Sequence, residues 1–177
     1  MDKQGIRSGE KGYSLLEFLV SLPVLLMLLA GLGTAFTIFL RGYFGILGNW
    51  EVQEQVRFSM QRIVRDLQCA IDADTTMYGT LDIRVKGKNA EETSIVYKLY
   101  TDDNAAHILK RNKAGYGGPQ PITGGSILAD VSIVDFHCYR LGRIVFIVLE
   151  GENKMSKYYF SLESAVCLPN VLEKGHE

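Results

Sequence analysis

The sequence lacks the features that mark most enzymes and nucleic-acid-binding proteins. Its 19 basic and 20 acidic residues give a formal net charge of −1, so no basic excess favours a nucleic-acid partner. His107, His137 and His176 do not stand at metal-ligand spacings from one another or from the cysteines, and no C-x-x-C pair is present. No serine or cysteine stands in a recognised nucleophile setting. We therefore expect no enzyme activity, no metal and no cofactor.

Cysteine is scarce, and the three cysteines lie far apart in the sequence. One interpretation is that all three are small buried thiols, since unpaired cysteine is commonly buried. If the domain faces an oxidising compartment, Cys138 and Cys167 are the first pair to consider for a disulfide, because both lie in expected strands of the C-terminal half. Cys69 would then have no partner.

One long apolar run dominates the N-terminal part of the chain. Between Tyr13 and Leu40 the only ionisable side chains are Glu17 and the phenol of Tyr13. About 20 apolar residues are enough to cross a bilayer as a helix. We therefore expect residues 13–40 to form a single transmembrane helix in contact with the lipid bilayer.

The segment before this run, residues 1–12, is short and polar, and it is expected to be a leader peptide. Its basic side chains are Lys3, Arg7 and Lys11, whereas only Arg41 closely follows the run. Basic residues favour the cytoplasmic side of a membrane span. The sequence therefore predicts a single-pass protein of the cytoplasmic (inner) membrane with a cytoplasmic N-terminus.

After the apolar run the pattern changes to that of an amphipathic helix. Apolar residues recur at spacings of three and four along one stripe: Val52, Val56, Met60, Ile63, Leu67 and Ile71. We expect residues 41–72 to continue the helix out of the membrane and to lie against a soluble domain. Gly42, Gly45 and Gly48 recur within this stretch and are candidates for a soft point in the helix.

The remaining residues, 73–177, have the alternation and turn signals of β-strands. Residues 81–85 alternate apolar and polar side chains, and Ile95, Tyr97 and Leu99 recur at every second position. Two later apolar runs are joined by Leu141 and Gly142, which predicts a hairpin with glycine at the second loop position. The second run, IVFIVL, is typical of a central strand covered on both faces, and residues 112–126 are expected to be irregular because they are rich in glycine and proline. The prediction is an α+β fold with four to six mainly antiparallel strands packed on the outer half of one long helix.

The most informative residues lie where the leader meets the apolar run. Gly12 ends the leader, Tyr13 follows it, and Glu17 is the fifth residue counted from Tyr13. Here the sequence resembles the class III signal peptide of type IV prepilins and type II secretion pseudopilins. The resemblance implies cleavage by prepilin peptidase between Gly12 and Tyr13 and N-methylation of Tyr13. It also implies that Glu17 pairs with the amino terminus of a neighbouring subunit during assembly, which would give a purpose to a carboxylate that costs a few kcal/mol in an apolar span.

Further expectations follow from this resemblance. It implies a type IV pilin-like fold, with other pilins or pseudopilins and an inner-membrane assembly platform as partners. It also implies an extracytoplasmic filament: a type IV pilus, a secretion pseudopilus or a DNA-uptake filament. Two positions depart from the family pattern. Tyr13 replaces the usual phenylalanine, and Pro23 stands nearer the N-terminus than the proline of major pilins, where it should kink or locally free the helix.

The C-terminal two thirds resembles W-type minor pilins and J-type pseudopilins. Those proteins share an I-x-Y-x-L strand, an L-x-R strand, a late F-x-x-Y element and a terminal L-R-N. The matching residues here are, in order, Ile95, Tyr97 and Leu99; Leu109 and Arg111; Phe136 and Tyr139; and Leu168 and Asn170 on either side of Pro169. The last motif departs from the family pattern, because Pro169 stands where arginine is usual.

The apolar run is also compatible with alternatives to the prepilin interpretation. A secretory signal peptide needs an apolar core of about 7–15 residues, and this run is about twice that length. An uncleaved anchor that carries a non-polymerising extracytoplasmic binding domain explains the run but not Glu17. Glu17 could also reach the interface from a span that begins later in the sequence.

Overall fold

The structure is a computed structural model that describes residues 11–75, 79–86, 91–101, 106–124 and 130–169. Within residues 11–14 only the backbone is described. The chain divides into two compact units, residues 1–44 and residues 45–177. The first ten residues of the expected leader lie outside the described residues.

A single helix, α1, extends from Lys11 to Gln68 and crosses Pro23 without interruption, although proline has no N–H to donate to the carbonyl of Leu19. Gly42 and Gly45 also lie within it, with no other atoms near the position of a Cβ. The helix ends four residues earlier than expected. At its end the Cys69 amide donates to the carbonyl of Asp66 in a tight turn.

The apolar stripe on the second half of α1 is confirmed as the centre of the core of residues 45–177. Val52, Val56, Ile63 and Leu67 are fully buried, and Met60 is nearly so. Ile71 does not extend this stripe. It lies half-buried in the first strand, because the chain has already left the helix.

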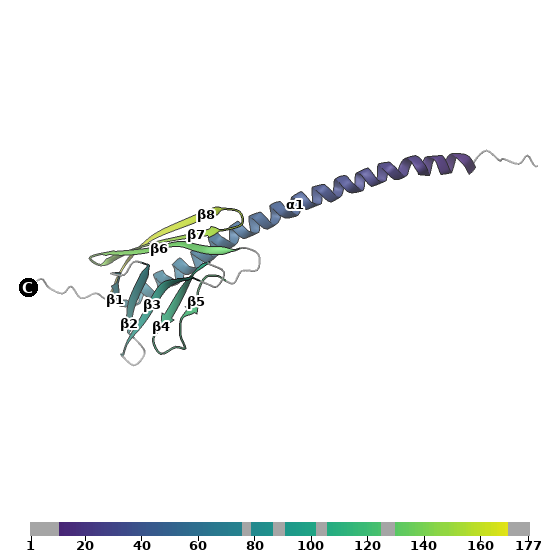
Figure 1. The fold of residues 1–177 in the computed structure, drawn as a ribbon. Helices are drawn as coiled ribbons and strands as arrows, with labels where there is room; N and C mark the ends of the chain where they lie inside the picture. The colour runs from purple at the N-terminus through teal and green to yellow at the C-terminus, as the bar shows by residue number, and fades with distance from the viewer. Residues whose placement is uncertain (1–10, 76–78, 87–90, 102–105, 125–129, 170–177) are drawn as a thin grey trace, which may run out of the picture. The chain divides into compact units, whose positions relative to one another are not determined.

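Eight strands are present among the described residues, in two antiparallel sheets (Figure 1). The five-stranded sheet is formed in chain order by β1 (Ala70–Asp74), β2 (Thr80–Lys86), β3 (Glu92–Thr101), β4 (His107–Lys113) and β5 (Gln120–Pro121). The three-stranded sheet is formed by β6 (Val131–Leu141), β7 (Ile144–Asn153) and β8 (Tyr158–Cys167). The α+β class and the antiparallel pairing are therefore confirmed, and the arrangement is consistent with a pilin-like fold.

Two local expectations were wrong. Residues 112–126 contain β5, a two-residue strand that pairs with Lys110 and Arg111. The β6–β7 hairpin has Gly142 and Arg143 as its loop, since Leu141 still pairs with Ile144. Gly142 therefore takes the first loop position, with a φ of 59°, and a two-residue loop of type II′ has glycine at that position.

The central strand β7 is covered on one face only, contrary to the expectation from its apolar run. Val145, Ile147 and Leu149 are buried within the core. Phe146 and Val148, which point to the opposite face, are only half-buried. Tyr139 of β6 stacks on Phe146, with their ring centroids 4.7 Å apart, so this outer face is apolar but open to solvent.

Gly151 of β7 is required for the close approach of the strand to α1. A Cβ at this position would lie 2.7 Å from Cγ2 of Val56 and 3.2 Å from Cγ1 of Val52. Both neighbours are β-branched, and their χ1 rotamers are stiff in a helix. We expect Gly151→Ala to lower the free energy of unfolding by about 1–3 kcal/mol through overpacking. Urea unfolding monitored by circular dichroism measures this change, and Ser161→Ala on the exposed face of β8 is the control. Equal stability of Gly151→Ala and wild type would contradict the close approach.

Candidate functional site

The first half of α1 exposes an unbroken series of apolar side chains. Met27 is 76% exposed, and even Leu22, among the less exposed of this series, is 45% exposed. Among the described residues, α1 is the one helix long and apolar enough to cross a membrane, and none of its most apolar window is buried. This part of the chain is consistent with single-pass membrane anchoring. Its compartment and orientation remain predictions.

The hydroxyl groups of this segment bond to the backbone of their own helix. Ser21 donates to the carbonyl of Phe18 at 3.0 Å. Thr34 donates to the carbonyl of Gly31 and Thr37 to that of Gly33, each at 2.8 Å. Polar side chains in lipid need such partners because no water is available there. These hydroxyls therefore need no hydrogen-bond partner from a second molecule.

The carboxylate of Glu17, unlike these hydroxyls, has no described hydrogen-bond partner. It lies on one face of α1 with Leu16, Val20, Ser21 and Val24, and it forms no hydrogen bond or ion pair with another described side chain. The Gly12–Tyr13 bond lies in the first turn of the same helix. Cleavage there would place a new ammonium group four residues before Glu17, about 6 Å along the helix axis. The structure therefore sets the candidate cleavage point and the carboxylate one turn apart, while the side chains of Gly12 and Tyr13 lie outside the described atoms.

A second arrangement joins the end of α1 to the five-stranded sheet. Asp66 accepts a hydrogen bond from the Tyr97 hydroxyl at 2.6 Å and one from Nε of Arg111 at 2.8 Å. Tyr97 and Arg111 are paired across β3 and β4. Burial, followed by the hydrogen bond to Asp66, raises the pKa of the Tyr97 phenol. Burial lowers the pKa of Arg111, but hydrogen bonds to Asp66 and Tyr97 outweigh this effect and raise it overall.

The cluster of Asp66, Tyr97 and Arg111 gives two of the sequence motifs a structural role. Tyr97 belongs to the I-x-Y-x-L pattern and Arg111 to the L-x-R pattern, and both converge on the same helix carboxylate. Asp66 itself was not singled out in the sequence, because it resembles any other polar residue off the apolar stripe. Phe136 of the third motif is buried, whereas Tyr139 is half exposed. Asn170 of the last motif lies outside the described residues.

The cysteines are free thiols, and the Cys138–Cys167 disulfide considered from the sequence is not formed. Strand β7 lies between β6 and β8, so the two cysteines are separated by two strand spacings, about 10 Å, across the sheet. They are also offset along the strands, because Cys138 is level with Ser164 and not with Cys167. A disulfide needs Cα atoms within about 7 Å. Cys138 is buried, which raises its pKa to about 12. Cys69 and Cys167 are exposed, so burial of all three was also wrong.

Within the described ranges, no group of three or more His, Cys, Asp or Glu side chains is placed to hold a metal ion. His107 contacts the Thr101 hydroxyl at 3.2 Å, and His176 lies outside those ranges. Comparisons with protein-family models, with curated proteins and with solved structures found no match for this chain.

Proposed function

We propose that this chain is a structural minor pilin or pseudopilin that is processed by prepilin peptidase and assembled into a filament. The apolar half of α1 would anchor the precursor in the cytoplasmic membrane and then pack with the same helices of neighbouring subunits. The β domain would be displayed outside the filament core. No catalytic role is proposed.

The observation that carries this proposal is the setting of Glu17. It is the only ionisable side chain among the described residues from Leu15 to Leu40, and it has no partner among them. A carboxylate in such an apolar segment needs a cation or a hydrogen-bond donor. An amino terminus freed between Gly12 and Tyr13 on a neighbouring subunit would supply that cation, and a repeating pair of this kind would set the axial register of the filament.

The subunit type that we propose is W-type minor pilin or J-type pseudopilin. The support is the sequence motifs, two of which meet at Asp66 and so have a defined structural role. The proposed partners are prepilin peptidase, other pilins or pseudopilins, the inner-membrane assembly platform and the lipid bilayer. The filament would be a type IV pilus, a secretion pseudopilus or a DNA-uptake filament.

A single-pass protein whose outer domain binds a partner without polymerising is the alternative. The exposed apolar helix supports this alternative equally well. The two functions differ at the N-terminus, because only the proposed pilin is cleaved and methylated.

Intact-mass measurement of the protein extracted from membranes of its native host separates the two functions. We expect the loss of residues 1–12 and the gain of one methyl group on the new terminal amine of Tyr13. Gly12→Leu, which replaces the residue before the proposed cut, is expected to retain the leader and to provide the matched control. A wild-type protein that still carries residues 1–12 would exclude the pilin proposal.

A further inference from the structure

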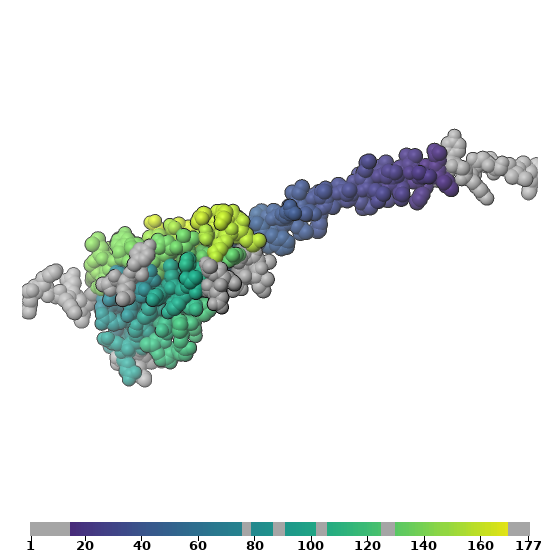
Figure 2. Space-filling view, in the orientation of Figure 1, coloured from purple at the N-terminus to yellow at the C-terminus, as the bar shows by residue number. Residues whose placement is uncertain are grey.

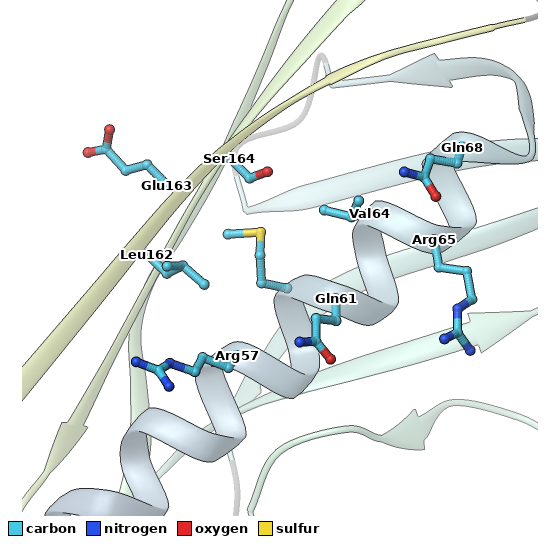
Figure 3. A pocket seen from close by; sticks show the side chains of 9 residues that line it. Arg57, Gln61, Val64, Arg65, Gln68, Leu162, Glu163 and Ser164 are labelled. Carbon is cyan, nitrogen blue, oxygen red and sulfur yellow. The ribbon is translucent and has the colours of Figure 1, made fainter.

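An open groove lies between the second half of α1 and strand β8, within residues 45–177 (Figure 3). At one end the helix and strand are joined. Nε2 of Gln53 donates to the Tyr158 hydroxyl at 2.6 Å, and the Arg57 guanidinium lies 5.6 Å from the centre of the Phe160 ring. Further along, a groove of about 480 Å³ opens between α1 and the strand residues Leu162, Glu163 and Ser164.

The strand that borders this groove is an unprotected sheet edge. Among the described residues β8 pairs only with β7, over ten residues without a break in register. It contains no proline and no lysine, two residues that commonly protect sheet edges against unwanted pairing. In Figure 2 the yellow β8 lies at the surface of the second unit.

The other three sheet edges are protected in ways that β8 is not. β1 is five residues long and carries a register shift near Asp72. β5 has two residues, one of them Pro121. β6 has a register shift between Ile133 and Asp135 and packs against the five-stranded sheet. The long, regular edge of β8 is therefore the place in the described structure where another strand can be added.

The helix side of the groove is basic. Arg57, Gln61 and Arg65 follow one another at intervals of four residues, and all three are exposed. No described carboxylate forms an ion pair with either arginine. Glu163, the one acidic residue at the border, points away from α1 in Figure 3. The groove thus presents two cations over a base that includes the apolar side chains of Met60, Val64 and Leu162.

The spacing of these groups selects an extended ligand. Arg57 and Arg65 are eight residues apart, or about 12 Å along the helix axis. Residues i and i+4 of a strand lie on the same face and are about 13 Å apart. A single strand has unpaired backbone groups that the β8 edge can satisfy, whereas the backbone groups of a helical ligand are already paired within the helix.

We propose that this groove binds an extended acidic segment of a partner protein, which pairs with β8 as a fourth strand of the β6–β7–β8 sheet. The segment would carry the pattern acid-x-apolar-x-acid. Its two carboxylates would meet Arg57 and Arg65, and its central apolar side chain would lie over Met60, Val64 and Leu162. The inference concerns the β domain and does not depend on filament assembly.

The test measures binding of a fluorescein-labelled peptide, Thr-Glu-Thr-Val-Thr-Glu-Thr, to the full chain in detergent. The fluorescence anisotropy of the peptide reports the bound fraction. We expect saturable binding that weakens as salt is raised. Arg65→Glu should weaken it about tenfold or more, since the change of sign replaces attraction with repulsion, and Arg57→Glu combined with Arg65→Glu should weaken it further. Arg62→Glu, an exposed residue of the same helix outside the groove, should change it less than about twofold.

Amide hydrogen exchange tests strand addition separately from charge. Bound peptide should slow exchange along Tyr158–Cys167 and leave β1 unchanged. Arg57→Glu can weaken folding by losing its contact with Phe160, so Arg65→Glu alone must show the loss of affinity. The inference is overturned if the peptide does not bind, if Arg65→Glu binds it as tightly as Arg62→Glu, or if β8 gains no protection.

The same protein preparation can show whether the groove instead binds a second copy of the chain or the chain's own C-terminal residues. Self-association in sedimentation that Arg65→Glu abolishes would assign the groove to a second copy of the chain. Tighter peptide binding after truncation at Pro169 would assign it to the chain's own C-terminal residues. Either result would overturn the assignment to a partner protein.

Discussion

Glu17→Ala is expected to reach the membrane and to lose its leader normally, but to be reduced about a hundredfold or more in assembled filaments. The reason is that each new subunit would bury a terminal ammonium without a carboxylate partner. Removing one member of a buried ion pair costs about 3–5 kcal/mol, and each increment of about 1.4 kcal/mol is a factor of ten in an equilibrium constant. Quantitative immunoblotting of sheared filaments and of membranes from the native host measures both fractions.

Ser21→Ala is the matched control for this prediction. Ser21 lies on the same face of α1 as Glu17, one turn later, and its hydroxyl already bonds to its own helix. We expect it to assemble normally. If Glu17→Ala assembled at the wild-type level, Glu17 would not set the axial register, even if mass measurement confirmed cleavage after Gly12.

The second large effect is expected at Asp66. Asp66→Ala should lower the free energy of unfolding of the β domain by about 3 kcal/mol, because it leaves the Arg111 guanidinium and the Tyr97 hydroxyl near-buried without their acceptor. The side chains of Arg111 and Asp66 are only 13% and 14% exposed, so water replaces the lost carboxylate poorly. In a domain of this size the loss corresponds to a decrease in Tm on the order of 10 °C.

Thermal unfolding of the detergent-solubilised protein, followed by near-ultraviolet circular dichroism, measures this effect. Glu54→Ala on the exposed side of the same helix is expected to change stability by less than about 0.5 kcal/mol. A double variant, Asp66→Ala with Arg111→Met, should be more stable than Asp66→Ala alone, because it removes the uncompensated charge. If Asp66→Ala were as stable as Glu54→Ala, the cluster would not be what ties α1 to the sheet.

Glu17 and Asp66, the residues changed in these two predictions, could be recognised in the sequence to different degrees. Glu17 stood out because a single carboxylate in an apolar run is a departure that can be recognised without any structure. Asp66 did not stand out, since polar residues are common on the outer side of an amphipathic helix. It became distinct only when β3 and β4 placed Tyr97 and Arg111 beside it.

The errors in predicting the fold have a common cause. The run IVFIVL indicated a strand covered on both faces, but only tertiary packing decides how many layers cover a strand, and α1 covers one face of β7. Likewise, Cys138 and Cys167 both lie in strands as expected, yet the order of strands in the sheet puts β7 between them. Strand order and layer number are set by contacts between residues distant in sequence.

The sequence by itself determined the apolar anchor, the amphipathic stripe on α1 and the antiparallel hairpins, because hydrophobic periodicity and turn residues act over a few neighbouring positions. Only the tertiary structure decided that Gly151 must be glycine, that Asp66 is shared by Tyr97 and Arg111, and that Arg57 and Arg65 line the groove beside β8. These features depend on the distance between elements after packing. Local sequence patterns do not contain that distance.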